Sequence, residues 1–227
     1  GIYFDNAIQS AVVQLKKEID DCQIRYQELE EKNQELSSEY QDSGTPNEDD
    51  IEILEELGDC SMHIGWLQEN LCAIAEMKIV NLYKSLEIDT KYILSKIYEN
   101  TETKQFFRWD LLISFLKAKD IQPSELNGYT ETNQLRIVNN QIKHGGTLKD
   151  DIKSIPEFNG LSTFTYQALD NFLNRVENPV NNYFTELSKK VYEDKYEFSD
   201  DRLNRIVSDF KARMDRTTLN KLIEKLK

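Results

Sequence analysis

Three polar residues near the middle of the chain have side chains suited to holding a phosphate and moving a proton. In QLRIVNNQIKHGG, residues 134–146, Arg136, Asn140 and His144 follow one another at intervals of four. On an α-helix each interval of four turns the side chain by only about 40°, so the three residues predict one polar stripe ending at the helix C-terminus. A guanidinium, an amide and an imidazole can together grip phosphate oxygens and exchange protons near neutral pH. The stripe is therefore a candidate catalytic site.

The same stripe has a structural interpretation as well. Gly145 is a natural left-handed cap for a helix that ends at His144, and the helix dipole would stabilise a cationic histidine there. Three apolar residues of this helix have the spacing of a core-facing side: Leu135, Val138 and Ile142. The polar stripe would then be a hydrogen-bond network that holds a loop or a dimer in place without catalysis.

Other site chemistries find little support in the sequence. It contains no glycine-rich phosphate loop, HExxH, GxSxG or paired-cysteine motif, and the acidic run NEDDIEILEE lacks the glycine of a calcium loop. We therefore expect neither a metal nor a cofactor. The second histidine, His63, lies beside an apolar stripe, which favours a packed or solvent-edge position. The cysteines are odd in number, and we expect buried free thiols rather than disulfide or metal ligands: Cys22, Cys60 and Cys72.

The composition favours a helical and unevenly charged protein. Among 227 residues there are only 8 Gly and 4 Pro, so few positions interrupt a helix. The net charge of −13 comes from residues 1–60, with 4 Lys and Arg against 17 Asp and Glu, whereas residues 61–227 have 24 of each sign. So acidic a segment would repel nucleic-acid phosphates. No apolar run is long enough to span a membrane, and the N-terminus does not have the basic and then apolar pattern of a leader. We therefore expect a cytoplasmic protein that does not bind a membrane.

Heptad spacing dominates the N-terminal third. One apolar register contains Ile8, Leu15, Cys22, Leu29 and Leu36, and a second contains Val12, Ile19, Tyr26, Asn33 and Tyr40. The pattern predicts one helix from about Tyr3 to Tyr40. A break at SGTPNEDD follows, with Thr45 as N-cap and Pro46 at the first helical position of the next helix.

A second apolar stripe predicts that the next helix folds back on the first as an antiparallel hairpin. Its residues are Ile53, Leu57, Cys60, Ile64, Leu67, Leu71 and Ile74. Gly58 and Gly65 lie seven residues apart in this helix, and close approach of another helix explains them better than a nucleotide loop. The packing partner of the heptads, within the chain or in a second copy, is left open.

Beyond Leu86 the pattern predicts several shorter helices. Asp89 would cap a helix through Tyr92, Ile93 and Ile97, and an aromatic helix would run from Phe106 to about Lys119. A short turn at Pro123 ends at Gly128, and the stripe helix runs from about Glu131 to His144. Another helical stretch would run from Phe164 to Val191, with Pro179 either starting a new helix or kinking this one. The last helix would begin after a Ser199 cap and continue through Leu222. No strand is expected, so the fold class is all-α.

Four segments together resemble the HEPN superfamily, named for higher eukaryotes and prokaryotes nucleotide-binding. They are AEMKIVNLYKSLE, FRWDLLISFL, LRIVNNQIKHGG and the amphipathic helix that follows. The resemblance covers about residues 60–195 and implies a helical bundle, frequently a homodimer, and in many members a metal-independent endoribonuclease of a toxin or antiviral system. We accordingly expect an acidic extension at 1–60, a HEPN-like bundle at 61–195 and a C-terminal helix at 196–227.

The family hallmark is an Arg followed by a polar residue and, four to six residues on, a His. Asn140 and His144 match the polar residue and the His, but Asn139 stands where the Arg belongs, and Arg136 lies one helical turn earlier on the same stripe. The resemblance implies attack of an RNA 2′-hydroxyl on the adjacent phosphate. His144 would act as acid or base, Arg136 or Lys143 would stabilise phosphoryl charge, and Asn140 would orient the phosphate. Asn139 and Lys143 are the further substrate-binding candidates.

Three hypotheses follow. The first, which the altered motif favours, is a non-catalytic or divergent HEPN-like protein that binds RNA, a nucleotide or a protein partner. The second is a metal-independent endoribonuclease that depends on His144 and dimerisation. The third is a structural protein that assembles through its acidic N-terminal hairpin.

Overall fold

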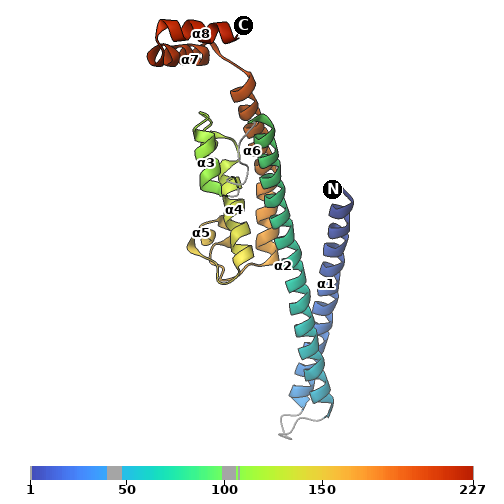
Figure 1. Ribbon diagram of the computed structural model, residues 1–227. Coiled ribbons are helices and arrows are strands. Elements are labelled where there is room, and N and C mark those ends of the chain that lie inside the picture. The colour runs from blue at the N-terminus through green and yellow to red at the C-terminus, as the bar shows by residue number, and fades with distance from the viewer. Residues whose placement is uncertain (1, 40–47, 99–105, 107, 227) are drawn as a thin grey trace. The chain divides into compact units, whose positions relative to one another are not determined.

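The computed structural model describes residues 2–39, 48–98, 106 and 108–226, and these residues form helices and connecting loops without a strand. The long helices are α1 (Ile2–Glu39), α2 (Glu48–Ile97) and α6 (Tyr166–Tyr196). The shorter elements are α3 (Trp109–Lys117), η2 (Pro123–Glu125), α4 (Tyr129–His144), α5 (Asp150–Lys153), η3 (Pro156–Phe158), α7 (Asp200–Arg213) and α8 (Arg216–Leu226). The predicted all-α class is confirmed for this part of the chain (Figure 1). None of these helices is long and apolar enough to cross a membrane.

The chain divides into two compact units that interleave along the sequence. Unit 1 contains residues 1–85 and 130–178, and unit 2 contains residues 86–129 and 179–227. The long helices α2 and α6 are each divided between the two units, at residues 85/86 and 178/179. The expected boundaries at residues 60 and 195 stay a prediction.

In unit 1, α1 and the first half of α2 lie side by side and run in opposite directions (Figure 1). Their buried contact residues are Ile8, Val12 and Ile19 of α1 and Leu67 and Leu71 of α2. Further toward the connection between the helices, Arg25 Nη2 lies 2.7 Å from Glu56 Oε2. The heptad residues of α1 therefore pack within the chain, because the apolar stripe of α2 supplies their partner.

The rest of unit 1 is built around α4 and the first half of α6. Phe158 of η3 is fully buried and packs against Phe164 and Phe172, with ring centroids 5.1 and 5.3 Å apart. Arg175 of α6 forms a two-pronged ion pair with Glu157, with 2.5 Å between Nε and Oε1 and 2.9 Å between Nη2 and Oε2. These contacts fix the segment that follows α4 against α6.

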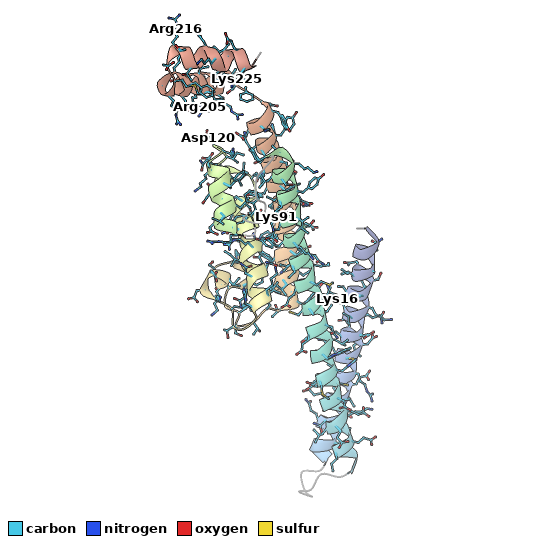
Figure 2. The ribbon with its side chains drawn as sticks, in the orientation of Figure 1. Lys16, Lys91, Asp120, Arg205, Arg216 and Lys225 are labelled. Atoms are coloured by element: carbon cyan, nitrogen blue, oxygen red, sulfur yellow. The ribbon has the colours of Figure 1, made fainter. Side chains whose placement is uncertain are left out.

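In unit 2, Tyr98 at the end of α2 donates its O–H to Asp194 Oδ2 of α6 at 2.5 Å. Burial, together with this hydrogen bond, raises the pKa of Tyr98 above its ordinary value. Gly128 has φ +83° and lies directly against the backbone of Pro179. An ion pair 3.8 Å long joins Asp120 to Arg205 of α7, and both side chains are exposed (Figure 2).

Several predicted boundaries were wrong. Asp89 does not cap a new helix, because α2 continues through it to Ile97, and the aromatic helix begins at Trp109 rather than at Phe106. The predicted C-terminal helix is two helices. The Ser199 cap is confirmed, since its side chain accepts the N–H of Arg202, but the chain breaks after Arg213. Asp215 starts α8 by accepting the N–H of Thr218 at 2.8 Å.

Further expectations concerned single prolines, glycines and a helix cap. Pro179 lies inside a continuous α6, so it does not start a new helix. A methyl group added at Gly58 or Gly65 would meet nothing within 4 Å, so the expected close approach of a helix is absent within the described residues. The Thr45 cap and Pro46 fall outside the described residues.

Candidate functional site

The polar stripe of α4 lines one cavity in unit 1, of about 340 Å³. Arg136, Asn140 and His144 all contribute to its wall, as their four-residue spacing predicted. The opposite side of α4 is buried, because Leu135 and Val138 are fully covered by the core. This amphipathic pattern fixes the rotation of α4 and thereby turns the stripe toward the cavity. We call this hollow the α4 cavity.

The end of α4 is shaped by two glycines and a buried glutamine. Gly145 has φ +64° and donates its N–H to Gln141 O at 2.9 Å, which closes the helix with a left-handed residue as expected. Gly146 also has a positive φ, +84°, so the chain reverses sharply. The buried Gln141 side chain donates to Gly145 O at 3.0 Å and is 3.3 Å from Thr147 O. Gln141 thus holds the loop that forms the far wall of the cavity.

This loop brings two charged residues that the sequence interpretation missed. Lys149 and Asp151 line the α4 cavity together with Ile152. Asp151 Oδ1 accepts the N–H of Ile152 at 3.0 Å, and Ile152 itself is fully buried. The signal in the sequence was the glycine pair followed by acidic residues, which marks a reversal and a new helix start. This signal does not reveal which side chains after the reversal line the cavity beside α4.

Arg136 is held in place by its own helix. Its Nε and Nη2 donate to Asn133 Oδ1 at 3.1 and 3.0 Å. Asn133 lies three residues earlier, so this contact fixes one edge of the planar guanidinium. A fixed guanidinium loses less conformational entropy when it binds an anion than a mobile one.

Asn139 and Lys143 do not line the cavity. Asn139 is fully buried on the core side of α4, and its Nδ2 lies 3.4 Å from Asn140 Oδ1. An arginine at this position would have to bury its charge, which costs several kcal/mol unless a partner is present. The core side of α4 is thus unsuited to the arginine of the HEPN pattern. Lys143 is exposed, and the substrate contacts expected of both residues stay predictions.

The charges around the α4 cavity differ from those of the chain as a whole. Arg136 and Lys149 bring two cationic groups, Asp151 brings one carboxylate, and His144 brings an imidazole. The chain carries −13 overall. The hollow therefore carries a small cationic excess, although the protein as a whole is acidic.

The remaining histidine and the cysteines have structural surroundings. His63 is exposed and stacks on Trp66, with ring centroids 5.8 Å apart, so the solvent-edge interpretation is confirmed. The three cysteines are free thiols, as expected, although each is only half-buried. Burial raises the pKa of Cys72, whose Sγ lies 3.8 Å from Phe164 O. Within the described part of the chain, no three His, Cys, Asp or Glu side chains are grouped to hold a metal ion.

Comparison with known proteins finds no matching family model, no matching curated protein and no matching solved structure. The geometry of the site is therefore the basis for assigning a function.

Proposed function

We propose that the α4 cavity binds a phosphate-bearing ligand, namely a nucleotide or a short single-stranded RNA segment. The observation that supports this proposal is the convergence of Arg136, Asn140, His144 and Lys149 on one cavity. Two cationic groups and an amide supply N–H donors for phosphate oxygens. Asp151, on the same cavity, can accept a hydrogen bond from a ribose hydroxyl or a base amine.

The size of the site agrees with such a ligand. A volume of about 340 Å³ is at the lower end of the range for small-molecule sites, which begins at about 300 Å³. It leaves room for one nucleotide, and a longer RNA would extend past the exposed end of α4. This interpretation treats the protein as a HEPN-like member that keeps ligand binding while its arginine has moved by one turn along the helix.

RNA cleavage without metal is the second candidate. His144 and Asp151 line the same cavity, so two groups able to exchange protons lie beside the proposed phosphate site. The 2′-oxygen would attack the neighbouring phosphorus as its proton passes to one group, and the bond to the 5′-oxygen would break as that oxygen takes a proton. The products are a 2′,3′-cyclic phosphate and a 5′-hydroxyl. Arg136 would stabilise the charge that develops on the phosphoryl oxygens.

The HEPN resemblance also implies a homodimer, a place in toxin or antiviral defence, and a cytoplasmic location. We include the dimer in the proposal because family sites are composed of two copies. Light scattering tests it directly, since a dimer has twice the monomer mass of 26.6 kDa.

The central experiment measures binding of fluorescent mixed-sequence RNA and of a labelled nucleotide by anisotropy, without metal. Arg136→Ala and Lys149→Ala should each weaken binding by about tenfold and reduce its salt dependence, because each removes one phosphate contact. Arg216→Ala removes an exposed cation of α8 and is the matched control. Equal affinities of all four proteins would contradict the proposal.

Analysis of the RNA after incubation separates the two candidates. Cyclic-phosphate ends that form with the wild-type protein and disappear in His144→Ala would establish cleavage. Binding with intact RNA would establish the ligand-binding function alone.

A further inference from the structure

The N-terminal half of α2 has an apolar surface on the side turned away from α1. It consists of Ile51, Leu54, Gly58, Met62, Gly65 and Trp66, which recur at three, four or seven residues. On a helix, this spacing places them within one band about 120° wide. The residues that contact α1, such as Ile64, Leu67 and Leu71, lie on the opposite side. We call the exposed band the outer stripe.

Most of the outer stripe is uncovered among the described residues, and its end at Gly65 borders a cavity of about 680 Å³ that Lys16 of α1 and Tyr166 of α6 also line. Met62 is 69% exposed, Trp66 55% and Leu54 54%. Gly58 and Gly65 leave open space, because an added Cβ would meet nothing within 4 Å at either position. Glycine in a helix interior costs up to about 1 kcal/mol relative to alanine, and the described residues provide no packing against these two glycines that would offset this cost. Close approach of an external helix would use the space they leave.

The charges beside the outer stripe indicate the kind of partner. Between Glu48 and Met77 the sequence has nine Asp and Glu and no Lys or Arg. Glu55, Asp59 and Glu69 lie within or at the edge of the band, and all three are exposed. Glu56 is already paired with Arg25 of α1. A second copy would oppose like charges across the contact, whereas a basic helix would place its cations against these carboxylates.

The side chains are of the types that contribute most to binding. Tryptophan and methionine are enriched at protein interfaces, and tryptophan is frequently an energetic hot spot. Stacking on His63 holds the Trp66 ring against its own helix. From Ile51 to Trp66 the stripe is about 22 Å long at 1.5 Å per residue, which matches a partner helix of about fifteen residues.

We infer that the outer stripe binds a basic amphipathic helix of another protein. The apolar side of that helix would cover Leu54, Met62 and Trp66, and its backbone would approach closest at Gly58 and Gly65. Its Lys or Arg residues would flank the contact on the acidic side chains. This surface is separate from the α4 cavity, so the inference does not depend on the proposed phosphate ligand.

The test uses the full chain with Trp109→Phe, so that Trp66 is its only tryptophan. The probe is a synthetic helical peptide of leucine and lysine in amphipathic arrangement, and its counterpart has glutamate in place of lysine. Titration with the lysine peptide should shift Trp66 emission to shorter wavelength, since the ring becomes buried. The glutamate peptide should produce no shift.

Uncharged substitutions separate the stripe from general attraction to an acidic protein. The variants Gly65→Gln and Trp66→Ala should each weaken binding of the lysine peptide by about tenfold or more without changing the net charge. Because Trp66→Ala removes the fluorescent ring, its affinity is measured from the anisotropy of a labelled peptide. Ile88→Ala is the matched control, because Ile88 is a 53% exposed residue of α2 outside the stripe. Three results would overturn the inference: unchanged affinity in both stripe variants, equal binding of the two peptides, or burial of Trp66 by self-association without peptide.

Discussion

At the scale of single residues, the Glu157–Arg175 ion pair gives unit 1 a defined response to acid. The Glu157 side chain is only 12% exposed. The hydrogen bonds from Arg175 lower its carboxyl pKa below the ordinary value of 4.5, although burial acts in the opposite direction. A carboxylate with a lowered folded pKa stabilises the protein above the unfolded pKa, and this contribution is lost as the pH falls through the folded pKa.

The variant Glu157→Gln should therefore lose about 1 to 2 kcal/mol of unfolding free energy at pH 7, a value moderated by the 35% exposure of Arg175. Its difference from wild type should shrink as the pH falls below about 4.5. Urea unfolding at pH 7, 5 and 3 measures both effects. Asp110→Asn removes an exposed pair with Arg108 and should leave the midpoint unchanged. A constant difference across this pH series would rule out the ion pair as its cause.

Substitutions at Gly128 and Gly160 separate the energetic cost of an unfavourable backbone conformation from the cost of a steric clash. Both have positive φ, +83° and +77°. A Cβ at Gly128 would lie 1.9 Å from Pro179 O, whereas a Cβ at Gly160 would meet nothing within 4 Å. Gly160→Ala should cost about 1 kcal/mol from conformational strain alone. Gly128→Ala should cost at least about 3 kcal/mol, because backbone atoms must move. Chemical unfolding measures the two costs, and similar values would show that the Pro179 contact relaxes freely.

The α4 cavity shows which residues of a site can be found from sequence. Arg136, Asn140 and His144 belong to one helix, so helical periodicity was sufficient to predict their common side. Lys149 and Asp151 reach the cavity through a loop whose path depends on Gln141, and no periodic rule gives such a path. The family pattern assigns a chemical role to Asn139, but it does not reveal that the packing of α4 places this side chain on the buried side of the helix.

At the scale of elements, Arg202 makes the closest polar contacts between α7 and the end of α6. Neither α7 nor α8 has a buried residue. Arg202 donates to Glu197 O at 3.0 Å and to Glu193 O at 3.3 Å, and its Nη2 lies 3.2 Å from Asp194 Oδ1. Arg202 thereby binds the backbone at and just beyond the C-terminal end of α6, where Glu193 O also accepts the N–H of Glu197.

Replacing this residue, in Arg202→Ala, should release α7 while leaving the core of unit 2 folded. Amide exchange in α7 should become at least about tenfold faster, because charge-assisted hydrogen bonds are lost, and exchange in the middle of α6 should be unchanged. Arg205→Ala is the control, since its pair with Asp120 is 3.8 Å long and exposed (Figure 2). Equal acceleration in both variants would indicate that the helix responds to charge alone.

Element type was easier to predict than element length. Apolar periodicity predicted the helices, but polar residues in a helix interior were read as helix ends. Asp89 has the chemistry of a cap, yet α2 passes through it because Leu86, Thr90 and Leu94 are buried on one side and hold the helix together. The break after Arg213 was missed because α7 and α8 each have regularly spaced apolar residues, and the five-residue interval from Met214 to Leu219 was not taken as an interruption. In α2, tertiary contact thus overrides the local capping preference of Asp89.

At the scale of the whole molecule, charge is the property that the sequence specifies most directly. All of the net charge of −13 is accounted for by residues 1–60, and the remaining residues balance. Folding places much of this charge on α1 and the start of α2, two antiparallel helices in contact. Their apolar residues hold together a pair of helices that repel each other, with Arg25 between Glu28 and Glu56 as a local exception.

Screening should therefore stabilise the hairpin more than the rest of the chain. Raising NaCl from 0.01 M to 1 M shortens the Debye length from about 30 Å to about 3 Å, so repulsion between exposed carboxylates largely vanishes. We expect amide protection in α1 to rise by roughly fivefold, equivalent to about 1 kcal/mol. The α4 amides are the internal reference, because residues 61–227 carry no net charge. A general salting-out effect would raise protection equally in both helices, whereas screening of repulsion predicts a selective gain in α1. Equal gains would mean that repulsion between carboxylates does not measurably destabilise the hairpin. The charge beside the outer stripe would then affect only the binding of partners.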